Sequence, residues 1–293
     1  MTVAVFLKPV RRTDVPLRLE PARPALHPGE ITLVANGADL SALAMALGLR
    51  GSGASQPGKL IVVTVGPPAW EESLRDALAY GADEAWRVWP EGWLDEEPML
   101  EDGSAGHTRR VALAGAAALA PLAPALVLTG ERSADSGHES FGAFLAHALG
   151  AAFAHRVVEA APEPTGWRVR VKLERGYTQE MTVAAPAVMT VATQGAHPAY
   201  PSLPAWMRSR TAPVTRVAPA VDSPPGGTAT ALRSPLPRVK RYRVPEGSLS
   251  AEARIQAMVS LPAAGGGTVL PVELEPDEQA RQLARFLKER GYG

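Results

Sequence analysis

The stretch Lys59–Asp83, KLIVVTVGPPAWEESLRDALAYGAD, decides the fold. It opens with Lys59–Val65, a run of apolar and mostly β-branched side chains that is typical of a buried strand in a parallel sheet. Gly66-Pro67-Pro68 ends this run, and Trp70–Tyr80 then carries apolar residues at helical spacing before Gly81. A strand, a tight turn and a helix in this order predict one unit of an α/β fold.

The same order of strands and helices extends through the first two hundred residues, roughly, on both sides of this stretch. Apolar runs predict strands at Val3–Leu7, Ile31–Ala35, Ala85–Trp89, Ala125–Leu128 and Ala187–Val191. Helical spacing predicts helices at Leu40–Leu49, Thr108–Leu119 and Glu139–Leu149. We expect Asp39 to cap the first of these helices. The repetition predicts a parallel sheet with helices on both faces.

Two segments with period-two alternation interrupt this order. Trp167–Leu173 and Thr178–Val183 flank Arg175-Gly176-Tyr177, and the combination predicts an added β-hairpin.

The last part of the chain has a different composition. Val217–Pro245 is rich in Pro, Gly, Ser and Thr, which favours a linker or a wrapped arm. Helical patterns return at Ser250–Val259 and Asp277–Arg290. We therefore expect a domain over residues 1–215, a linker or arm over 216–249 and a C-terminal helical tail over 250–293.

Composition excludes several classes of protein. The 293 residues carry 30 basic and 30 acidic side chains, a balance that argues against binding nucleic acid or an anionic membrane. The absence of cysteine removes disulfides, thiol nucleophiles and cysteine-bound metals. With no apolar run of about 18 residues and no signal-peptide pattern, we expect a cytoplasmic globular protein without membrane insertion.

Amino-acid usage also bears on heat adaptation. Asn36 is the only asparagine, five of the 30 basic residues are lysine, and proline occurs 28 times. Heat adaptation would explain this usage, and the coding bias of a GC-rich genome would explain it equally.

Three loops follow predicted strands where an open parallel sheet binds ligands. They are Asn36–Asp39, Val65–Pro68 and Gly130–Ser140. The last combines small residues, hydroxyls and a helix N-terminus, which are groups that can hold a phosphate. A surface loop without a ligand has the same composition, so the pattern leaves both readings open.

Patterns of catalytic and metal sites are missing. Gly53–Leu60 is close to a P-loop, but Leu60 replaces the Mg²⁺-binding hydroxyl and the segment leads into a strand instead of a helix. The six histidines lack the spacing of zinc hydrolases, and no pair of carboxylates suggests acid–base chemistry. We therefore expect no catalytic residue and no metal site.

Several of these segments together resemble the beta subunit of electron transfer flavoprotein, over roughly residues 1–215. LRDALAYGAD at Leu74–Asp83 and the stretch Pro198–Met207 carry the resemblance most specifically. The other matching segments are Val3–Lys8, Asn36–Asp39, Ile61–Pro67, Leu126–Gly130 and Pro186–Thr190.

The resemblance implies a nucleotide-binding fold like that of adenine nucleotide alpha-hydrolases, in an electron-carrier subunit that is not itself a catalyst. It implies a heterodimer with an alpha subunit that holds most of a redox-active FAD. The beta subunit would carry AMP, or a second FAD in electron-bifurcating relatives. The implied electron donors are flavin dehydrogenases such as acyl-CoA dehydrogenase. The alternative is an adenine-nucleotide-binding regulatory or interaction protein on the same fold, without flavin electron transfer.

The resemblance also implies site residues. The implied nucleotide contacts are Phe6, Asn36, Gly37, Ala38, Asp39, Val65, Gly66, Gly130, Asp135, Ser136, His138, Glu139, Ser140 and Phe141. Asn36 would read an adenine or ribose edge, and the start of the helix near Glu139 would receive the phosphate. The implied partner-docking residues are Gly195, Pro198, Tyr200, Leu203 and Met207. The chain departs from the family at Glu139-Ser140-Phe141, and it has Gly195-Ala196 where the family inserts an apolar anchor.

Overall fold

The computed structural model describes residues 1–12, 14, 32–51, 58–90, 93, 105–193, 197–220, 250–253 and 275–289. The chain forms two compact units, residues 1–233 and residues 234–293. In the second unit, α7 (Pro276–Glu289) matches the helix expected at Asp277–Arg290, and of the helix expected at Ser250–Val259 only residues 250–253 are described.

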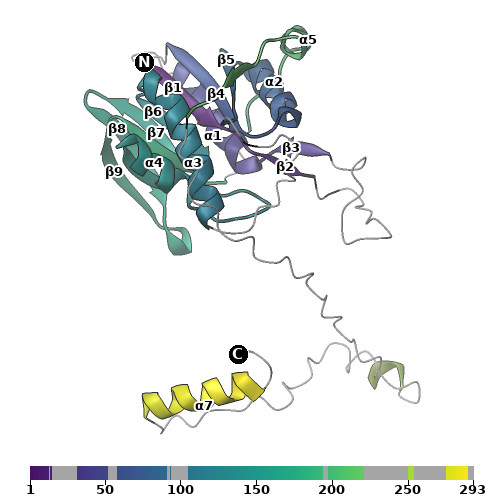
Figure 1. Ribbon diagram of the computed structural model, residues 1–293, viewed down its shortest axis with the longest axis vertical. Helices are drawn as coiled ribbons and strands as arrows, with labels where there is room; N and C mark the ends of the chain where they lie inside the picture. Colours follow the sequence, from purple (N-terminus) through teal and green to yellow (C-terminus); the bar gives the residue numbers. More distant parts are fainter. Residues whose placement is uncertain are drawn as a thin grey trace. The chain divides into compact units, whose positions relative to one another are not determined.

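A mostly parallel sheet, with nine strands among the described residues, forms the centre of the first unit (Figure 1). Its strands, in spatial order, are β11 (Thr215–Val217), β5 (Glu84–Val88), β4 (Lys59–Val65), β1 (Thr2–Phe6), β6 (Leu126–Gly130), β10 (Ala187–Val191), β7 (Ala152–Glu163), β8 (Gly166–Lys172) and β9 (Thr178–Ala184). Neighbours from β11 to β7 pair in parallel, whereas β7, β8 and β9 pair antiparallel. The predicted α/β class is confirmed.

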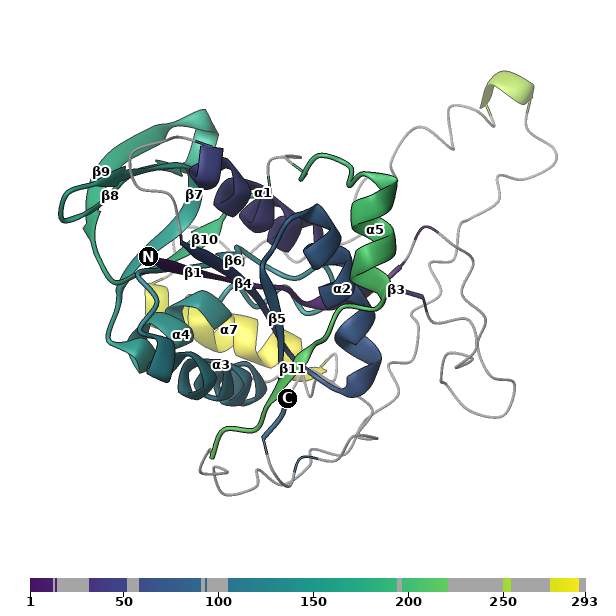
Figure 2. The ribbon, with the colours of Figure 1, turned by 90° about the horizontal axis from the view of Figure 1, so that it is seen from above.

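Helices cover both faces of this sheet (Figure 2). They are α1 (Gly37–Gly51), α2 (Glu71–Tyr80), α3 (Ala105–Leu119), α4 (Phe141–Leu149) and the short α5 (Leu203–Arg210). Alternation along β4 divides the core: Leu60 and Val62 pack with α1 and α2, whereas Ile61, Val63 and Val65 pack with α3 and α4. The continuous apolar run Lys59–Val65 is therefore buried on both faces, as expected for a parallel strand.

Some elements differ from the sequence-based expectations. The segment expected as Ile31–Ala35 is extended only as β3 (Leu33–Ala35), which pairs with β2 (Pro9–Arg11) outside the main sheet. The strand β7 was missed because most of its residues are only half-buried and register shifts between Ala154 and Glu159 break its alternation. As a result, the predicted hairpin strands β8 and β9 belong to a three-stranded antiparallel extension of the sheet.

Near the end of the first unit, α5 and β11 were also not predicted. The helix α5 begins after Ser202, whose hydroxyl accepts a hydrogen bond from the Ala205 N–H at 3.4 Å. The strand β11 extends the sheet next to β5, so the expected linker at residues 216–249 begins inside a strand. Residues 221–249 lie outside the described residues.

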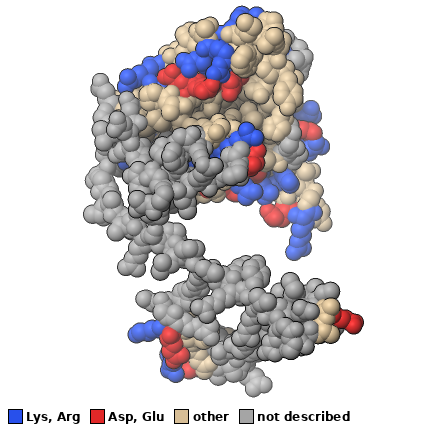
Figure 3. All heavy atoms as spheres, turned by 90° about the vertical axis from the view of Figure 1, so that its right-hand side faces the viewer, with Lys and Arg blue, Asp and Glu red and all other residues tan. Residues whose placement is uncertain are grey.

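The surface of the first unit carries both signs of charge. On the face seen in Figure 3, basic and acidic side chains lie next to one another. In this unit Lys59 pairs with Glu84 at 2.6 Å, and the buried Arg87 pairs with Glu71 at 2.8 Å. Within the described part of the chain, no helix has the length and apolar character that crossing a bilayer requires.

Candidate functional site

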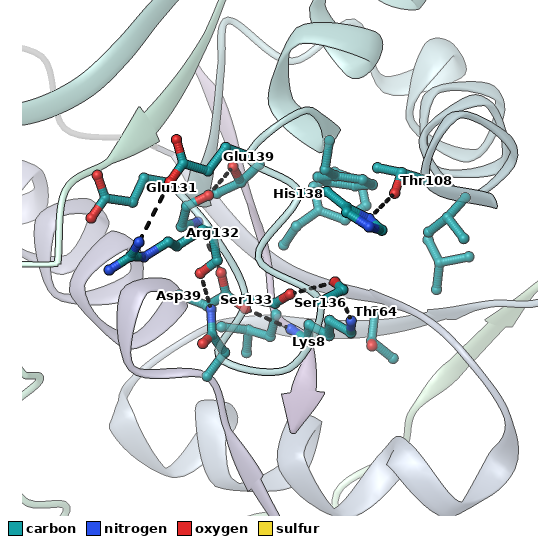
Figure 4. Close-up of a pocket in the computed structure, with 18 of the residues that line it drawn as sticks. Lys8, Asp39, Thr64, Thr108, Glu131, Arg132, Ser133, Ser136, His138 and Glu139 are labelled. Carbon is teal, nitrogen blue, oxygen red and sulfur yellow. Dashed lines mark hydrogen bonds and ion pairs between the residues drawn. The ribbon is translucent and has the colours of Figure 1, made fainter. Parts of the chain in front are cut away.

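A cavity opens at the carboxyl ends of β1, β4 and β6 (Figure 4). It holds about 770 Å³ of space, open solvent at its mouth included. The ends of these strands, the loop between β6 and α4 and the first turns of α1, α3 and α4 supply most of its walls. The lining residues are Phe6, Leu7, Lys8, Asn36, Asp39, Thr64, Val65, Trp70, His107, Thr108, Val111, Thr129, Gly130, Glu131, Arg132, Ser133, Ser136, His138, Glu139 and Phe141.

One wall of the cavity is aromatic and aliphatic. The Phe6 and Phe141 rings meet edge to face with centroids 5.2 Å apart. The Phe6 ring lies so close to α3 that a Cβ atom on Gly115 would be 2.8 Å from it, which explains the glycine there. Val65 and Val111 extend the same wall. Such a surface suits a planar apolar ring of a ligand.

Asp39 holds two strand ends together below the cavity. Its Oδ2 accepts a hydrogen bond from the Lys8 N–H at 2.8 Å, and its Oδ1 accepts one from the Gly130 N–H at 2.9 Å. Burial raises the pKa of the carboxyl to about 6, although these hydrogen bonds oppose the rise. A Cβ atom on Gly130 would lie 2.4 Å from Asp39 Oδ1. The expectation that Asp39 caps the helix is wrong, because α1 begins at Gly37 and the carboxylate bonds residues outside it.

Asn36 ties the start of α1 to the loop at residues 130–140. Its Nδ2 donates to the Arg132 carbonyl at 2.9 Å, and its Oδ1 accepts from the Ala134 N–H at 3.1 Å. In the same loop the hydroxyls of Ser133 and Ser136 lie 2.8 Å apart. Asn36 therefore shapes the loop, with one amide N–H and one carbonyl lone pair already used by the protein.

Lys8 brings a positive charge to the polar wall. Its Nζ lies 2.9 Å from Asp135 Oδ1 and 3.4 Å from the Ser136 hydroxyl. Burial opposes ionisation of Asp135, but hydrogen bonds from Ser133 and Lys8 outweigh this effect and lower the pKa of the carboxyl below its usual value. Asp135 is consequently a partner of Lys8, although it does not itself line the cavity.

The loop ends at the start of α4. His138 Nδ1 lies 3.1 Å from the Thr108 hydroxyl of α3. Glu139 has a left-handed backbone with φ of 55°, so the helix begins at Phe141 and not at Glu139 as expected. The Glu139 carboxylate lies 3.7 Å from Arg132 Nη1 and 4.0 Å from His155 Nε2. The Ser140 side chain makes no capping hydrogen bond, so it does not occupy the first N–H groups of α4.

The cavity brings together most of the nucleotide-contact residues expected from the sequence. The expected residues that line it are Phe6, Asn36, Asp39, Val65, Gly130, Ser136, His138, Glu139 and Phe141. Those that do not line it are Gly37, Ala38, Gly66, Asp135 and Ser140. Glu131, Arg132 and Ser133 also line it and belong to the expected loop at residues 130–140. Sequence reasoning missed the other lining residues, which are Leu7, Lys8, Thr64, Trp70, His107, Thr108, Val111 and Thr129. Lys8 lies two positions after Phe6, and Thr64 lies one position before Val65. Their places at the ends of predicted strands could have identified them as site residues.

The expected docking residues lie apart from the lining residues of the cavity. Tyr200 is 97% exposed and Leu203 is 68% exposed, and Met207 is also exposed. Trp206 adds a further exposed ring, with the Arg210 guanidinium 5.6 Å from its centroid. Pro198 is half-buried, and Gly195 lies outside the described residues. The segment therefore presents large apolar side chains to solvent.

Residues 30–222 match a family model described as the electron transfer flavoprotein domain. The chain is 31% identical to electron transfer flavoprotein subunit beta of Methylophilus methylotrophus, over 64% of this chain and 68% of that protein. It is 27% identical to the subunit beta of Syntrophomonas wolfei subsp. wolfei, over 98% of this chain and 96% of that protein. A further match is protein FixA of Bradyrhizobium diazoefficiens, 44% identical over 24% of this chain and 23% of that protein.

Proposed function

Because the chain belongs to the electron transfer flavoprotein family, among its beta subunits, we propose that it binds AMP in the cavity and joins an alpha subunit to hold FAD. FAD supplies the redox chemistry when it is bound. This chain is then a carrier subunit that positions the cofactor and presents it to dehydrogenases. The observation that carries the proposal is the cavity at the carboxyl ends of β1, β4 and β6, in a chain whose family is established.

The two walls of the cavity match the two halves of AMP. The wall formed by Phe6, Phe141 and Val65 offers an apolar face for the adenine ring. The loop at residues 130–140 and the N-terminus of α4 offer hydroxyls and backbone N–H groups for the ribose and the phosphate.

The carboxylates around the cavity are compatible with a bound phosphate. Glu139 lies near Arg132, Asp135 pairs with Lys8, and Glu131 accepts a hydrogen bond from the Thr193 N–H at 3.0 Å. Each of these three negative charges therefore has a partner of its own, which reduces its repulsion of an anionic ligand. A second FAD in place of AMP uses the same adenosine-binding walls and remains the other outcome of the test below.

Protein partners are the second part of the proposal. Tyr200, Leu203, Trp206 and Met207 form an exposed group of large apolar side chains, of the type enriched in interface cores. We assign this group, named here the 200–207 surface, to docking of flavin dehydrogenases. Arg208 at its edge would affect the association rate more than the affinity.

The ligand can be identified directly. The purified chain is denatured, and the released small molecule is identified by mass and quantified against protein. We expect about one AMP per chain and little flavin absorbance. Strong flavin absorbance at one equivalent per chain would show that the cavity holds a second FAD instead of AMP. No released nucleotide, together with no AMP binding in titration, would contradict the assignment of the cavity.

The alpha subunit is tested separately. Co-expression of this chain with an electron transfer flavoprotein alpha subunit from the same organism is expected to yield a yellow heterodimer. A chain that holds an adenine nucleotide but forms no flavin-containing complex would instead be a nucleotide-binding regulatory or interaction protein.

A further inference from the structure

Thr64 is a buried residue whose hydroxyl has no partner in the described part of the chain. Only 1% of its surface is exposed, and its Oγ1 makes no hydrogen bond with any described residue. It stands at the carboxyl end of β4 and lines the cavity. Alternation along the strand places Thr64 on the α1 side of the sheet, opposite Val65, which packs with α3 and α4.

The other hydroxyls of the cavity all have partners. Thr129 donates to the Gly130 carbonyl at 2.9 Å, Thr108 lies 3.1 Å from His138 Nδ1, and Ser133 and Ser136 contact each other at 2.8 Å. Among the five hydroxyl side chains that line the cavity, Thr64 alone has none within the described part of the chain. A buried polar group without a partner costs free energy, so each one needs an explanation.

Packing does not explain this threonine. The positions before and after it in β4 are valines, at Val62, Val63 and Val65, and valine has nearly the same shape as threonine. A valine at position 64 would therefore fill the same space and remove the cost of the unpaired hydroxyl. No described residue supplies a partner for this hydroxyl, and the packing of β4 does not require one.

We propose that the Thr64 hydroxyl hydrogen-bonds an oxygen of the nucleotide held in the cavity, on its ribose or its phosphate. Thr64 lines the same cavity as Lys8 and Ser136, which contact each other (Figure 4). The Lys8 ammonium is a donor, so this corner of the cavity suits an oxygen acceptor. The inference rests on the proposed function and adds Thr64 to the residues that select the ligand.

The test compares Thr64→Val with Thr64→Ser in the full chain after nucleotide removal. AMP affinity is measured by calorimetry, and stability of the nucleotide-free protein by urea unfolding. We expect Thr64→Val to weaken AMP binding about fivefold to tenfold, the usual effect of one hydrogen bond. Its urea midpoint should be equal to that of the wild type or higher. Thr64→Ser keeps the hydroxyl and should retain wild-type affinity within about twofold.

Thr129→Val is the matched control for stability. The Thr129 hydroxyl is also buried in the cavity wall but has a partner in the Gly130 carbonyl. Its loss should lower the urea midpoint, whereas loss of the Thr64 hydroxyl should not. A urea midpoint that falls in Thr129→Val but not in Thr64→Val distinguishes a structural hydroxyl from a ligand-binding one.

Three results would count against the proposal in distinguishable ways. Equal AMP affinity of Thr64→Val and the wild type would show that the hydroxyl does not contact the nucleotide. A lowered urea midpoint of nucleotide-free Thr64→Val would show that the hydroxyl has a partner in the empty protein. Failure of the wild type to bind AMP and FAD would overturn the proposed function, and this inference with it. Adenosine as a second probe assigns the oxygen, because a ribose contact weakens both ligands and a phosphate contact weakens AMP alone.

Discussion

Asp39 shows what a single buried carboxylate does in this protein. It accepts hydrogen bonds from the Lys8 and Gly130 N–H groups, which belong to the ends of β1 and β6. These bonds fix the distance between two strand ends that form the cavity floor. The same burial that makes them strong also disfavours the charge, and the pKa therefore rises to about 6.

The raised pKa of Asp39 predicts a pH dependence of stability. Between the ordinary value of 3.8 and about 6, the folded state binds the proton more tightly than the unfolded chain. Asp39 therefore favours folding more as the pH falls through 6. From about pH 7.5 to about pH 5, the wild type should gain about 1 kcal/mol of unfolding free energy relative to Asp39→Asn. Urea unfolding of both proteins at the two pH values measures the gain, and a constant difference would contradict it.

Asn36 and Asp135 act on the nucleotide through the loop at residues 130–140. Asn36→Ala removes two hydrogen bonds to the loop backbone, and Asp135→Ala removes the partner of Lys8. Asn36→Ala should weaken AMP binding by about 1–3 kcal/mol, because the partners of a buried amide then go unmatched. Asp135→Ala should weaken it by up to about 1 kcal/mol, because its contact with Lys8 is exposed. Calorimetry measures the loss. Glu180→Ala, an exposed carboxylate on β9, is the control, and wild-type affinity in both test variants would refute the assignment.

At the scale of elements, a glycine sets how closely α4 approaches the sheet. A Cβ atom on Gly142 would lie 2.4 Å from Thr190 Cγ2 on β10 and 3.3 Å from the Phe153 ring. Close approach of α4 keeps Phe141 beside Phe6 in the cavity wall. The packing of one helix therefore positions part of the site.

Two glycine variants test this contact. Gly142→Ala should lower the unfolding free energy by about 1–3 kcal/mol, because the added methyl overlaps β10. Gly48→Ala is the matched control: it lies within α1 with no neighbouring atom within 4 Å of the added Cβ. That change should raise stability by up to about 1 kcal/mol, since alanine loses less backbone entropy in a helix. Urea midpoints give both values, and a fully stable Gly142→Ala would contradict the packing argument.

At the scale of the whole molecule, the ligand and the proposed partner use different parts of the first unit. The cavity lies at strand ends, and most of its lining residues are half-buried or buried. The 200–207 surface is exposed, and none of its residues lines the cavity. The two functions should therefore be separable by mutation.

Tyr200→Ala combined with Leu203→Ala should slow electron transfer with the dehydrogenase partner while AMP content stays unchanged. The side chains are 97% and 68% exposed, so stability should change by no more than about 0.5 kcal/mol. Stopped-flow kinetics of the complex with the alpha subunit measures the rate. Tyr177→Ala, a 70% exposed tyrosine in the turn between β8 and β9, is the control. Normal rates in the double variant would place the docking surface elsewhere.

The local pattern of the sequence determined the main elements and the edge of the sheet where the site forms. Runs such as Lys59–Val65 predict buried strands, and the helical spacing of Trp70–Tyr80 predicts a helix, because both patterns depend only on nearby residues. Loops after such strands indicate the binding edge of the sheet for the same reason. The half-buried strand β7, with its register shifts, has no clear period and was missed.

Tertiary structure alone decided what the side chains of the site do. Asp39 bonds residues 31 and 91 positions away, and Asn36 donates to a carbonyl 96 positions away. Whether the Thr64 hydroxyl has a partner likewise depends on the elements packed around it. Such contacts form only when strands distant in the chain become neighbours in the sheet. Local periodicity records which face of an element is buried, but it does not record which residue of another element lies opposite.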